Sequence, residues 1–369
     1  MGAEFMKHII DRDDNGIEAL RRHHQVPGVG IALICNGRLE WNGGYGVLEA
    51  GAARKVTANS LFHACSISKM VTAVGVLRLV QAGVLDLDAE VNRYLRTWRL
   101  PDSPHSADVK VTLRHLLAHQ SGIVDPPGSF GIYRATDPLP VMKEILAGAT
   151  PYHVEPVHIQ NVPGSRFAYS DAGYCVIEQL IEDVTGEPFA VAMERLVMTP
   201  LGLKRTFYWN YYDSKIGRAE EIKAKASASA GHYQDGHVVD GSRAYYPCLA
   251  AAGLWSTPTE LALLALEVMA AWNGDTASIL QPELARQMLA GSGCADEVGL
   301  GVFVPSAEGE PLVVSQGWGV GFQCKLLAYP RLRSGIVVMT NSDPGKLQDE
   351  ALTGELIRHI GKPYGWLGL

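Results

Sequence analysis

The stretch HACSISKMVTAVGVLRLVQAGVL, residues 63–85, constrains the fold of this chain more than any other. From Ser66 onward its apolar residues surround a helical path instead of forming one stripe, a pattern typical of a helix buried on every side. Ser66 and Lys69 stand at the beginning of this helix, three positions apart, so their side chains share one face. The pattern predicts a central buried helix that carries a serine and a lysine at its N-terminal end.

This serine–lysine pair has a chemical interpretation and a structural one. A serine hydroxyl is a weak nucleophile until a base takes its proton, and a lysine that burial desolvates loses proton affinity and can be that base. Free N–H groups and the positive dipole end of the helix would stabilise an oxyanion beside Ser66. In the structural interpretation, Ser66 caps the helix and Lys69 reaches to water. The rest of the chain must decide between the two.

Composition limits the classes of partner. The chain has 369 residues, of which 47% are hydrophobic and 19% charged, as in a globular protein with one large domain or two that share a cleft. A net charge of −7 and the absence of runs of lysine or arginine argue against nucleic acid and against an anionic membrane. The apolar run 70–85 is too short for a membrane span. We therefore expect a small-molecule or peptidic substrate.

The cysteines and the N-terminus bear on location. Six cysteines are scattered without a C-x-x-C pair, so we expect them to be reduced and mostly buried. Cys65, next to Ser66, is expected to pack beneath the turn and not to act as a nucleophile. The opening MGAEF resembles a vector-derived extension before a start at Met6, and no secretion signal follows. The expected location is the cytoplasm.

The order of the expected elements is strands, then helices, then strands and a final helix. Asn36-Gly37 between two β-rich runs predicts a hairpin, and Thr257-Pro-Thr-Glu260 predicts a capped helix start. Strand-like runs then occupy residues 300–304, 311–315, 322–329 and 335–340, and a helix is expected at 346–360.

The simplest packing of these elements is an α+β fold. One antiparallel sheet, built from the early hairpin and the late strands, would be flanked by the N- and C-terminal helices, with a mostly helical lobe inserted. We expect the sheet lobe to comprise residues 6–62 and 295–369, and the helical lobe residues 63–294. The active site is expected in the cleft between them.

Three short segments together resemble a known family. They are Ser66-Ile-Ser-Lys69, Tyr169-Ser170-Asp171, and Ser315-Gln316-Gly317 followed by Gly321-Phe322. Their order and spacing are similar to the three motifs of the serine β-lactamase and penicillin-binding protein superfamily, nearest to the class C β-lactamase-like branch of esterases, D-aminopeptidases, amidases and transacylases. LRHLLAHQSGI, PLGLKRT, AAGLWSTPTEL and VVMTNSD, which begin at residues 113, 200, 251 and 337, also resemble that branch. The resemblance implies a β-lactamase/transpeptidase-like fold and favours the chemical interpretation of Ser66.

The resemblance also implies roles for individual residues. Ser66 would be the acylated nucleophile, with Lys69 and Tyr169 as the proton-transfer network. The backbone N–H groups of Ser66 and Trp318 would form the oxyanion hole, where each donor contributes several kcal/mol to the transition state. Gly317 would let the strand edge approach the substrate. The substrate-binding residues would be Asp171, Ser315, Gln316, Gly317 and Trp318.

Two motifs depart from the family pattern. The second usually ends in asparagine and here ends in Asp171. If Asp171 faces Lys69, its carboxylate would keep the lysine charged and shift the base role towards Tyr169, whereas a structural interpretation has Asp171 cap the next helix. The third usually begins with lysine or histidine, and here Ser315, beside Gln316, cannot supply the positive charge that holds a substrate carboxylate. We expect weak or no β-lactamase activity.

Other candidate sites are less specific. His115 and His119 have the i, i+4 spacing of zinc ligands, but the glutamate of H-E-x-x-H and a third ligand are missing, so we expect no metal and no organic cofactor. The aromatic run 207–212 could line a substrate pocket or pack a lobe.

The sequence thus predicts a serine hydrolase or acyltransferase that forms an acyl-enzyme at Ser66 from an ester or amide. Water would receive the acyl group in an esterase, amidase or D-peptidase-type hydrolase, and an amine or alcohol in a transacylase. The alternative is a non-catalytic or penicillin-sensing binding protein on the same fold.

Overall fold

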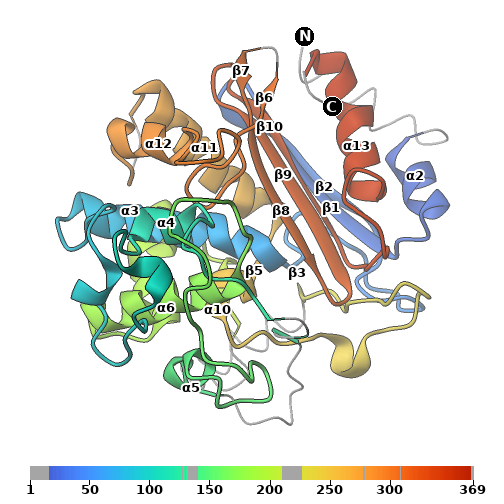
Figure 1. The fold of residues 1–369 in the computed structure, drawn as a ribbon. Coiled ribbons are helices and arrows are strands. Elements are labelled where there is room, and N and C mark those ends of the chain that lie inside the picture. The colour runs from blue at the N-terminus through green and yellow to red at the C-terminus, as the bar shows by residue number, and fades with distance from the viewer. Residues whose placement is uncertain are drawn as a thin grey trace.

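A five-stranded antiparallel sheet forms the framework of the molecule (Figure 1). The computed structural model describes residues 16–126, 128, 130–131, 140–209, 227–276, 279–307 and 309–366. The strand order is β2-β1-β10-β9-β8, so the early hairpin joins the late strands as expected. The strands are β1 Gly28–Cys35, β2 Arg38–Gly46, β8 Val313–Gly319, β9 Phe322–Tyr329 and β10 Ser334–Thr340. The predicted α+β class with an antiparallel sheet is confirmed.

Local sequence explains the first hairpin. Asn36 and Gly37, between β1 and β2, have φ angles of 51° and 72°, the left-handed region that an Asn-Gly turn of type I′ requires. β1 is buried at every position and is an interior strand of the sheet, between β2 and β10. Its continuous apolar sequence therefore matches a strand covered on both faces.

Helices cover both faces of the sheet (Figure 1). α2 (Ile17–His23) and α13 (Leu352–Gly361) pack on one face, and α11 (Pro258–Asn273) packs on the other against β1, β2 and β10. A Cβ atom on Gly30 of β1 would lie 2.8 Å from the ring of Pro258, so a glycine is needed where α11 begins. α11 thus covers the sheet although it falls within residues 63–294, the range expected for the inserted lobe.

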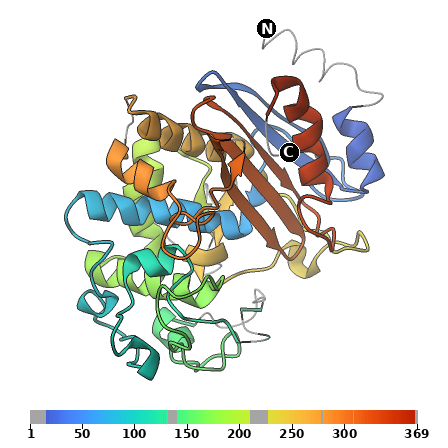
Figure 2. The ribbon, with the colours of Figure 1, turned by 45° about the horizontal axis from the view of Figure 1, so that its top comes forward.

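The other helices gather on the α11 side of the sheet (Figure 2). The ones that position the site are α3 Ser68–Gln81, α6 Asp171–Thr185 and α10 Leu249–Ala252. Around them lie α4 Leu113–Leu117, α5 Met142–Leu146, α7 Phe189–Met193, η4 Glu194–Met198, α8 Thr199–Leu201 and α12 Pro282–Met288. Short elements complete the fold: β3 Phe62–His63, β4 Phe207–Tyr208, β5 Leu254–Ser256, β6 Ser306–Ala307, β7 Glu310–Pro311, η1 Cys65–Ile67, η2 Val91–Arg93, η3 Pro104–Ser106, η5 Asp240–Ser242 and η6 Lys362–Tyr364.

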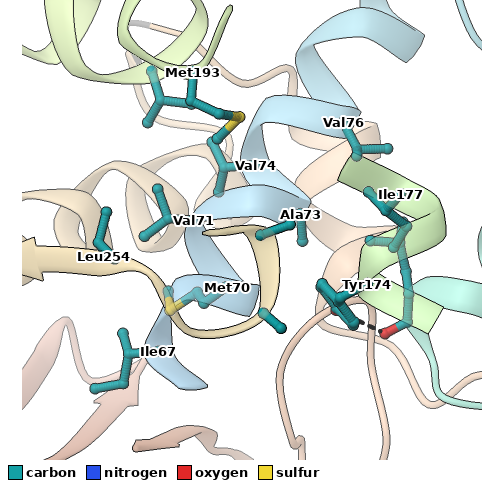
Figure 3. Close-up of a cluster of buried hydrophobic side chains, with 14 of the residues drawn as sticks. Ile67, Met70, Val71, Ala73, Val74, Val76, Tyr174, Ile177, Met193 and Leu254 are labelled. Carbon is teal, nitrogen blue, oxygen red and sulfur yellow. Dashed lines mark hydrogen bonds between the residues drawn. The ribbon is translucent and has the colours of Figure 1, made fainter. Parts of the chain in front are cut away.

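Helix α3 is buried along almost its whole length, as its sequence predicts. Every residue from Ser68 to Leu77 is buried, and apolar side chains from several elements surround it (Figure 3). A Cβ on Gly75 would lie 2.5 Å from the sulfur of Met193, so the glycine makes room for this side chain from α7. The N-terminal end of α3 is therefore fixed by packing on every side.

Some expected elements differ in extent. Residues 300–304 form no strand, because Phe303 makes only isolated bridges, to Val298 and to Val314. The last helix begins at Leu352 and not at 346. In the aromatic run, Phe207 and Tyr208 form β4, and Tyr208 and Trp209 are buried, so these residues pack the interior; 210–212 lie outside the described residues.

All six cysteines are free, and five of them are buried. Within the described part of the chain, no helix has the length and apolar character needed to cross a bilayer.

Candidate active site

Ser66 lies in a tight turn just before the central helix. It belongs to the 3-10 turn η1, and α3 begins two residues later, so Ser66 is not its cap. The preceding Cys65 is 1% exposed and has a φ of 49°, an uncommon backbone conformation for a residue with a side chain. Its thiol lies 3.2 Å from Nδ1 of His63 beneath the turn, and burial raises the pKa of that thiol well above its ordinary value. Cys65 therefore packs under the turn as expected and directs Ser66 outward.

Lys69 faces Ser66 from one helical turn on. Its Nζ donates to Ser66 Oγ at 3.1 Å and to the Ala251 carbonyl oxygen at 2.9 Å, and its side chain is 3% exposed. Lys69 therefore does not extend to water, contrary to the structural interpretation. The Ala251 carbonyl comes from α10, so this short helix helps to hold the ammonium in place.

Asp171 sets the charge of Lys69. Its Oδ1 lies 2.7 Å from Lys69 Nζ. Burial by itself lowers the pKa of Lys69, but the attraction of Asp171, followed by that of Tyr169, outweighs burial and raises the pKa above its ordinary value. The geometry matches the conditional expectation, in which Asp171 faces Lys69 and keeps the lysine charged.

The start of α6 holds Asp171 in that position. Ser170 is the N-cap, since its Oγ accepts from the Gly173 N–H at 3.0 Å, so the expectation that Asp171 caps this helix is wrong. Asp125 accepts from the N–H groups of Asp171 and Ala172 at 2.7 and 3.1 Å and from Ser170 Oγ at 2.7 Å. With these backbone groups satisfied by Asp125, the carboxylate of Asp171 turns towards Lys69.

Tyr169, the residue before the N-cap Ser170, completes the cluster. Lys69 and Ser66 lie close enough to its hydroxyl to influence its pKa, and Lys69 Nζ lies 4.8 Å from its ring centroid. Burial of the hydroxyl raises the pKa of Tyr169, and the positive charge of Lys69 counteracts part of that rise. The residue as a whole is 41% exposed, so Tyr169 separates the buried lysine from the open cleft.

His119 supports Tyr169 from behind. The two rings stack with centroids 4.3 Å apart, and His119 Nδ1 accepts from the Ser170 N–H at 3.1 Å. An Nδ1 that accepts is unprotonated, so a neutral ring carries its proton on Nε2. Burial, and then the charge of Lys69, lowers the pKa of His119 to about 3. The histidine is therefore a neutral part of the site.

The edge strand β8 supplies the facing wall. A Cβ on Gly317 would lie 2.3 Å from the Ala64 carbonyl oxygen, so only glycine lets the strand approach the Ser66 turn. Val314 exchanges both backbone hydrogen bonds with Phe303, on the side away from β9. Because backbone groups alternate in direction along a strand, the N–H groups of Gln316 and Trp318 point to this same open edge.

The predicted binding residues differ in accessibility. Ser315 is 4% exposed, and both Ser315 and Gln316 line a pocket of about 20 Å³ together with Ser66, Lys69 and Tyr169. The side chain of Trp318 is partly exposed, and its Nε1–H donates to Asp343 Oδ1 at 2.8 Å. Asp171, grouped with the substrate-binding residues in the sequence analysis, instead pairs with Lys69.

Two contributors to this cluster were missed in the sequence analysis. His119 was considered only as a zinc ligand, although it lies in the LLAHQSG segment that resembles the family. His115 Nδ1 instead accepts from the Thr112 N–H, at 3.3 Å. Asp125 stands 46 residues before Asp171, in an irregular segment without periodicity, so no signal in a single sequence marks it. No group of three residues suited to metal ligation occurs in the described ranges.

A buried helix that begins with S-x-x-K, an antiparallel sheet with helices on both faces, and a glycine-containing edge strand against the serine define a β-lactamase/transpeptidase fold. Comparison with known proteins agrees. A family model described as Beta-lactamase matches residues 14–359, and the chain belongs to this family.

Two relatives each match about half of the chain. Penicillin-binding protein 4 of Amycolatopsis lactamdurans is 32% identical over 191 residues, which are 51% of this chain and 46% of the relative. Esterase EstB of Burkholderia gladioli is 31% identical over 195 residues, 51% of this chain and 48% of the relative. The chain thus spans about half the length of these relatives.

Solved structures match over nearly the whole chain. D-amino acid amidase from Ochrobactrum anthropi SV3, complexed with D-phenylalanine, has a TM-score of 0.75 at 21% identity and covers 95% of this chain and 98% of its own. At this identity the likeness shows the shared fold, and the chemistry must be argued from the residues of the site.

Proposed function

We propose that the protein is a serine acyl-transfer enzyme that forms an acyl-enzyme at Ser66 from an ester or amide. The observation that carries this proposal is the position of Lys69 Nζ, 3.1 Å from Ser66 Oγ, 2.7 Å from Asp171 Oδ1 and 4.8 Å from the ring centroid of Tyr169. This arrangement brings a hydroxyl nucleophile, a fixed cation and a second ionisable oxygen together in a buried site.

We propose Tyr169 as the general base. Lys69 stays charged beside Asp171, so it stabilises negative charge and does not take the serine proton. Tyr169, as phenolate, takes the proton of Ser66 while Oγ bonds to the substrate carbonyl carbon. The oxyanion accepts hydrogen bonds from the N–H groups of Ser66 and Trp318. Collapse breaks the bond to the leaving group, which receives the proton from Tyr169.

The second half of the reaction mirrors the first. Water, an alcohol or an amine enters, gives its proton to Tyr169 and bonds to the acyl carbon, and Ser66 leaves with a proton returned by Tyr169. The name of Esterase EstB supports a hydrolytic outcome, while product analysis with and without an added amine separates hydrolase from transacylase. Ser315 provides no cation for a substrate carboxylate, so weak β-lactamase activity is part of the proposal.

Intact-protein mass spectrometry tests the proposal. The protein is exposed separately to a fluorophosphonate, to p-nitrophenyl esters and to a β-lactam. We expect one fluorophosphonate adduct on Ser66, turnover of the ester, and loss of both in Ser66→Ala. Ser165→Ala, which removes an exposed hydroxyl outside the pocket, is the matched control. An acyl adduct from the ester or the β-lactam that never turns over would favour the penicillin-sensing alternative, and full turnover by Ser66→Ala would remove the proposed mechanism.

A second variant tests the assigned base. Tyr169→Phe keeps the ring that stacks on His119 and removes the hydroxyl. We expect kcat for p-nitrophenyl acetate to fall about 10²- to 10⁴-fold, the usual contribution of general acid–base catalysis. An unchanged kcat would mean that a group other than Tyr169 is the general base.

A further inference from the structure

A large cavity adjoins the small pocket at Ser66. Its volume is about 740 Å³, whereas the pocket that contains Ser66, Lys69 and Tyr169 holds only about 20 Å³. Four residues line both spaces: Val298, Phe303, Val314 and Gln316. The small pocket has room for a reacting carbonyl, so the rest of a substrate must lie outside it, and the large cavity begins where the small pocket ends.

The wall of this cavity is mainly apolar. Its apolar residues come from the segment before Tyr169, from the loop that bridges β8, from the sheet face and from α13: Phe167, Phe303, Leu312, Val314, Leu327 and Ile357. Phe167 and Phe303 form an edge-to-face pair with centroids 6.3 Å apart, and Phe167 also contacts His119, at 5.9 Å. The rings of His119, Phe167 and Phe303 therefore form a continuous series of contacts from Tyr169 to the cavity.

Both positively and negatively charged side chains line the cavity. Lys325 is buried and paired with Asp349, and Arg358 of α13 also lines the cavity. Asp296 and Glu297 are exposed at the rim. Together with the absence of a cation at Ser315, this distribution does not select a group with a free carboxylate.

The position of the cavity relative to Tyr169 indicates which part of a substrate enters it. Tyr169 gives its proton to the leaving group, so the leaving group departs on the side of Tyr169, and Phe167 is two residues away from it. Trp318, the proposed oxyanion donor, follows Gln316 along β8 and lines neither the small pocket nor the large cavity. The leaving group, and later the acceptor, thus faces the cavity.

We infer that this cavity is the binding site for the leaving group and the acceptor, and that it takes an uncharged, bulky, apolar alcohol or amine. The inference rests on the proposed function of Ser66. A space of 740 Å³ lies within the range of sites that enclose drug-sized ligands, so a group of two or more fused rings fits. Substrates whose leaving group is a free amino acid are disfavoured.

Binding to an inactive variant tests this inference separately from catalysis. In a Ser66→Ala background that cannot be acylated, 2-naphthyl acetate is titrated by calorimetry. Ala295→Trp fills the cavity from its half-buried rim, and Ala52→Trp, in the loop after β2, is the matched control. We expect Ala295→Trp to weaken binding at least 10-fold and Ala52→Trp to leave it unchanged. Phe167→Ala, which removes one aromatic wall, is expected to weaken binding as well.

Turnover by the wild type provides a second readout. Between 2-naphthyl acetate and methyl acetate, which share an acyl group, kcat/KM should favour the naphthyl ester, and Ala295→Trp should reduce the ratio about 10-fold. Equal affinities of the Ala295→Trp and Ala52→Trp proteins would overturn the cavity assignment even if Ser66 reacts. Failure of the fluorophosphonate to label Ser66, with naphthyl acetate binding intact, would instead count against the proposed function alone.

Discussion

Acid sensitivity of the fold should depend on one buried histidine. The pKa of His119 is about 3 in the folded protein, because burial and then the charge of Lys69 oppose protonation. In the unfolded chain the value returns to about 6.5. Below pH 6.5 the unfolded state therefore binds a proton that the folded state does not, and stability is lost as the pH falls from 6.5 towards 3. Each unit in that window costs about 1.4 kcal/mol, so lowering the pH from 7 to 5 costs about 2 kcal/mol through this residue.

Urea unfolding at pH 7 and pH 5 measures this loss. His119→Asn offers an amide oxygen to the Ser170 N–H and cannot be protonated, so its stability should fall by about 2 kcal/mol less than that of the wild type over the same interval. Other titrating groups contribute equally to both proteins and cancel in the comparison. His105→Asn changes an exposed histidine and should behave like the wild type. The reasoning is refuted if the His119→Asn protein loses as much stability as the wild type.

Three further predictions concern the site. Asp171→Asn removes a negative charge that helps to raise the pKa of Tyr169, the proposed base, so the pH profile of fluorophosphonate labelling should shift to lower pH; an unshifted profile would contradict this role. In the wild type, labelling should accelerate as the pH rises and Tyr169, whose pKa is raised, loses its proton; a rate independent of pH between 6 and 9 would argue against the phenolate. Gly317→Ala places a methyl group 2.3 Å from the Ala64 carbonyl oxygen, so kcat for p-nitrophenyl acetate should fall about 100-fold or more, while Gly131→Ala, with open space around it, should change little.

The elements with strong local patterns were predictable. The Asn36-Gly37 hairpin, the wholly buried helix after Ser66 and the Thr257 cap of α11 each follow from residues close together in the sequence. The family resemblance then placed Tyr169 and Gly317 beside Ser66, although they are more than 100 residues away.

Contacts between distant segments could not be predicted in the same way. Phe303 belongs to a strand-like run, yet it makes only isolated bridges, to Val298 and to Val314. Asp125 holds the start of α6 through backbone N–H groups, which every sequence supplies, so nothing in the local pattern distinguishes this aspartate. The raised pKa of Lys69 depends on the direction of one carboxylate, which follows from the capping of α6 by Ser170 and Asp125.

One cluster of buried apolar side chains includes α3, α6 and α10 as well as Ala32, Val337 and Met339 of the sheet. The serine and the strand that faces it are thus attached to a single interior, and separating them would expose that interior to water. We expect the gap between them to keep its width when a substrate arrives. The site would then discriminate among acyl donors by how well their shape fits this fixed gap. A substrate too large for the gap would be excluded, because no hinge motion would widen it.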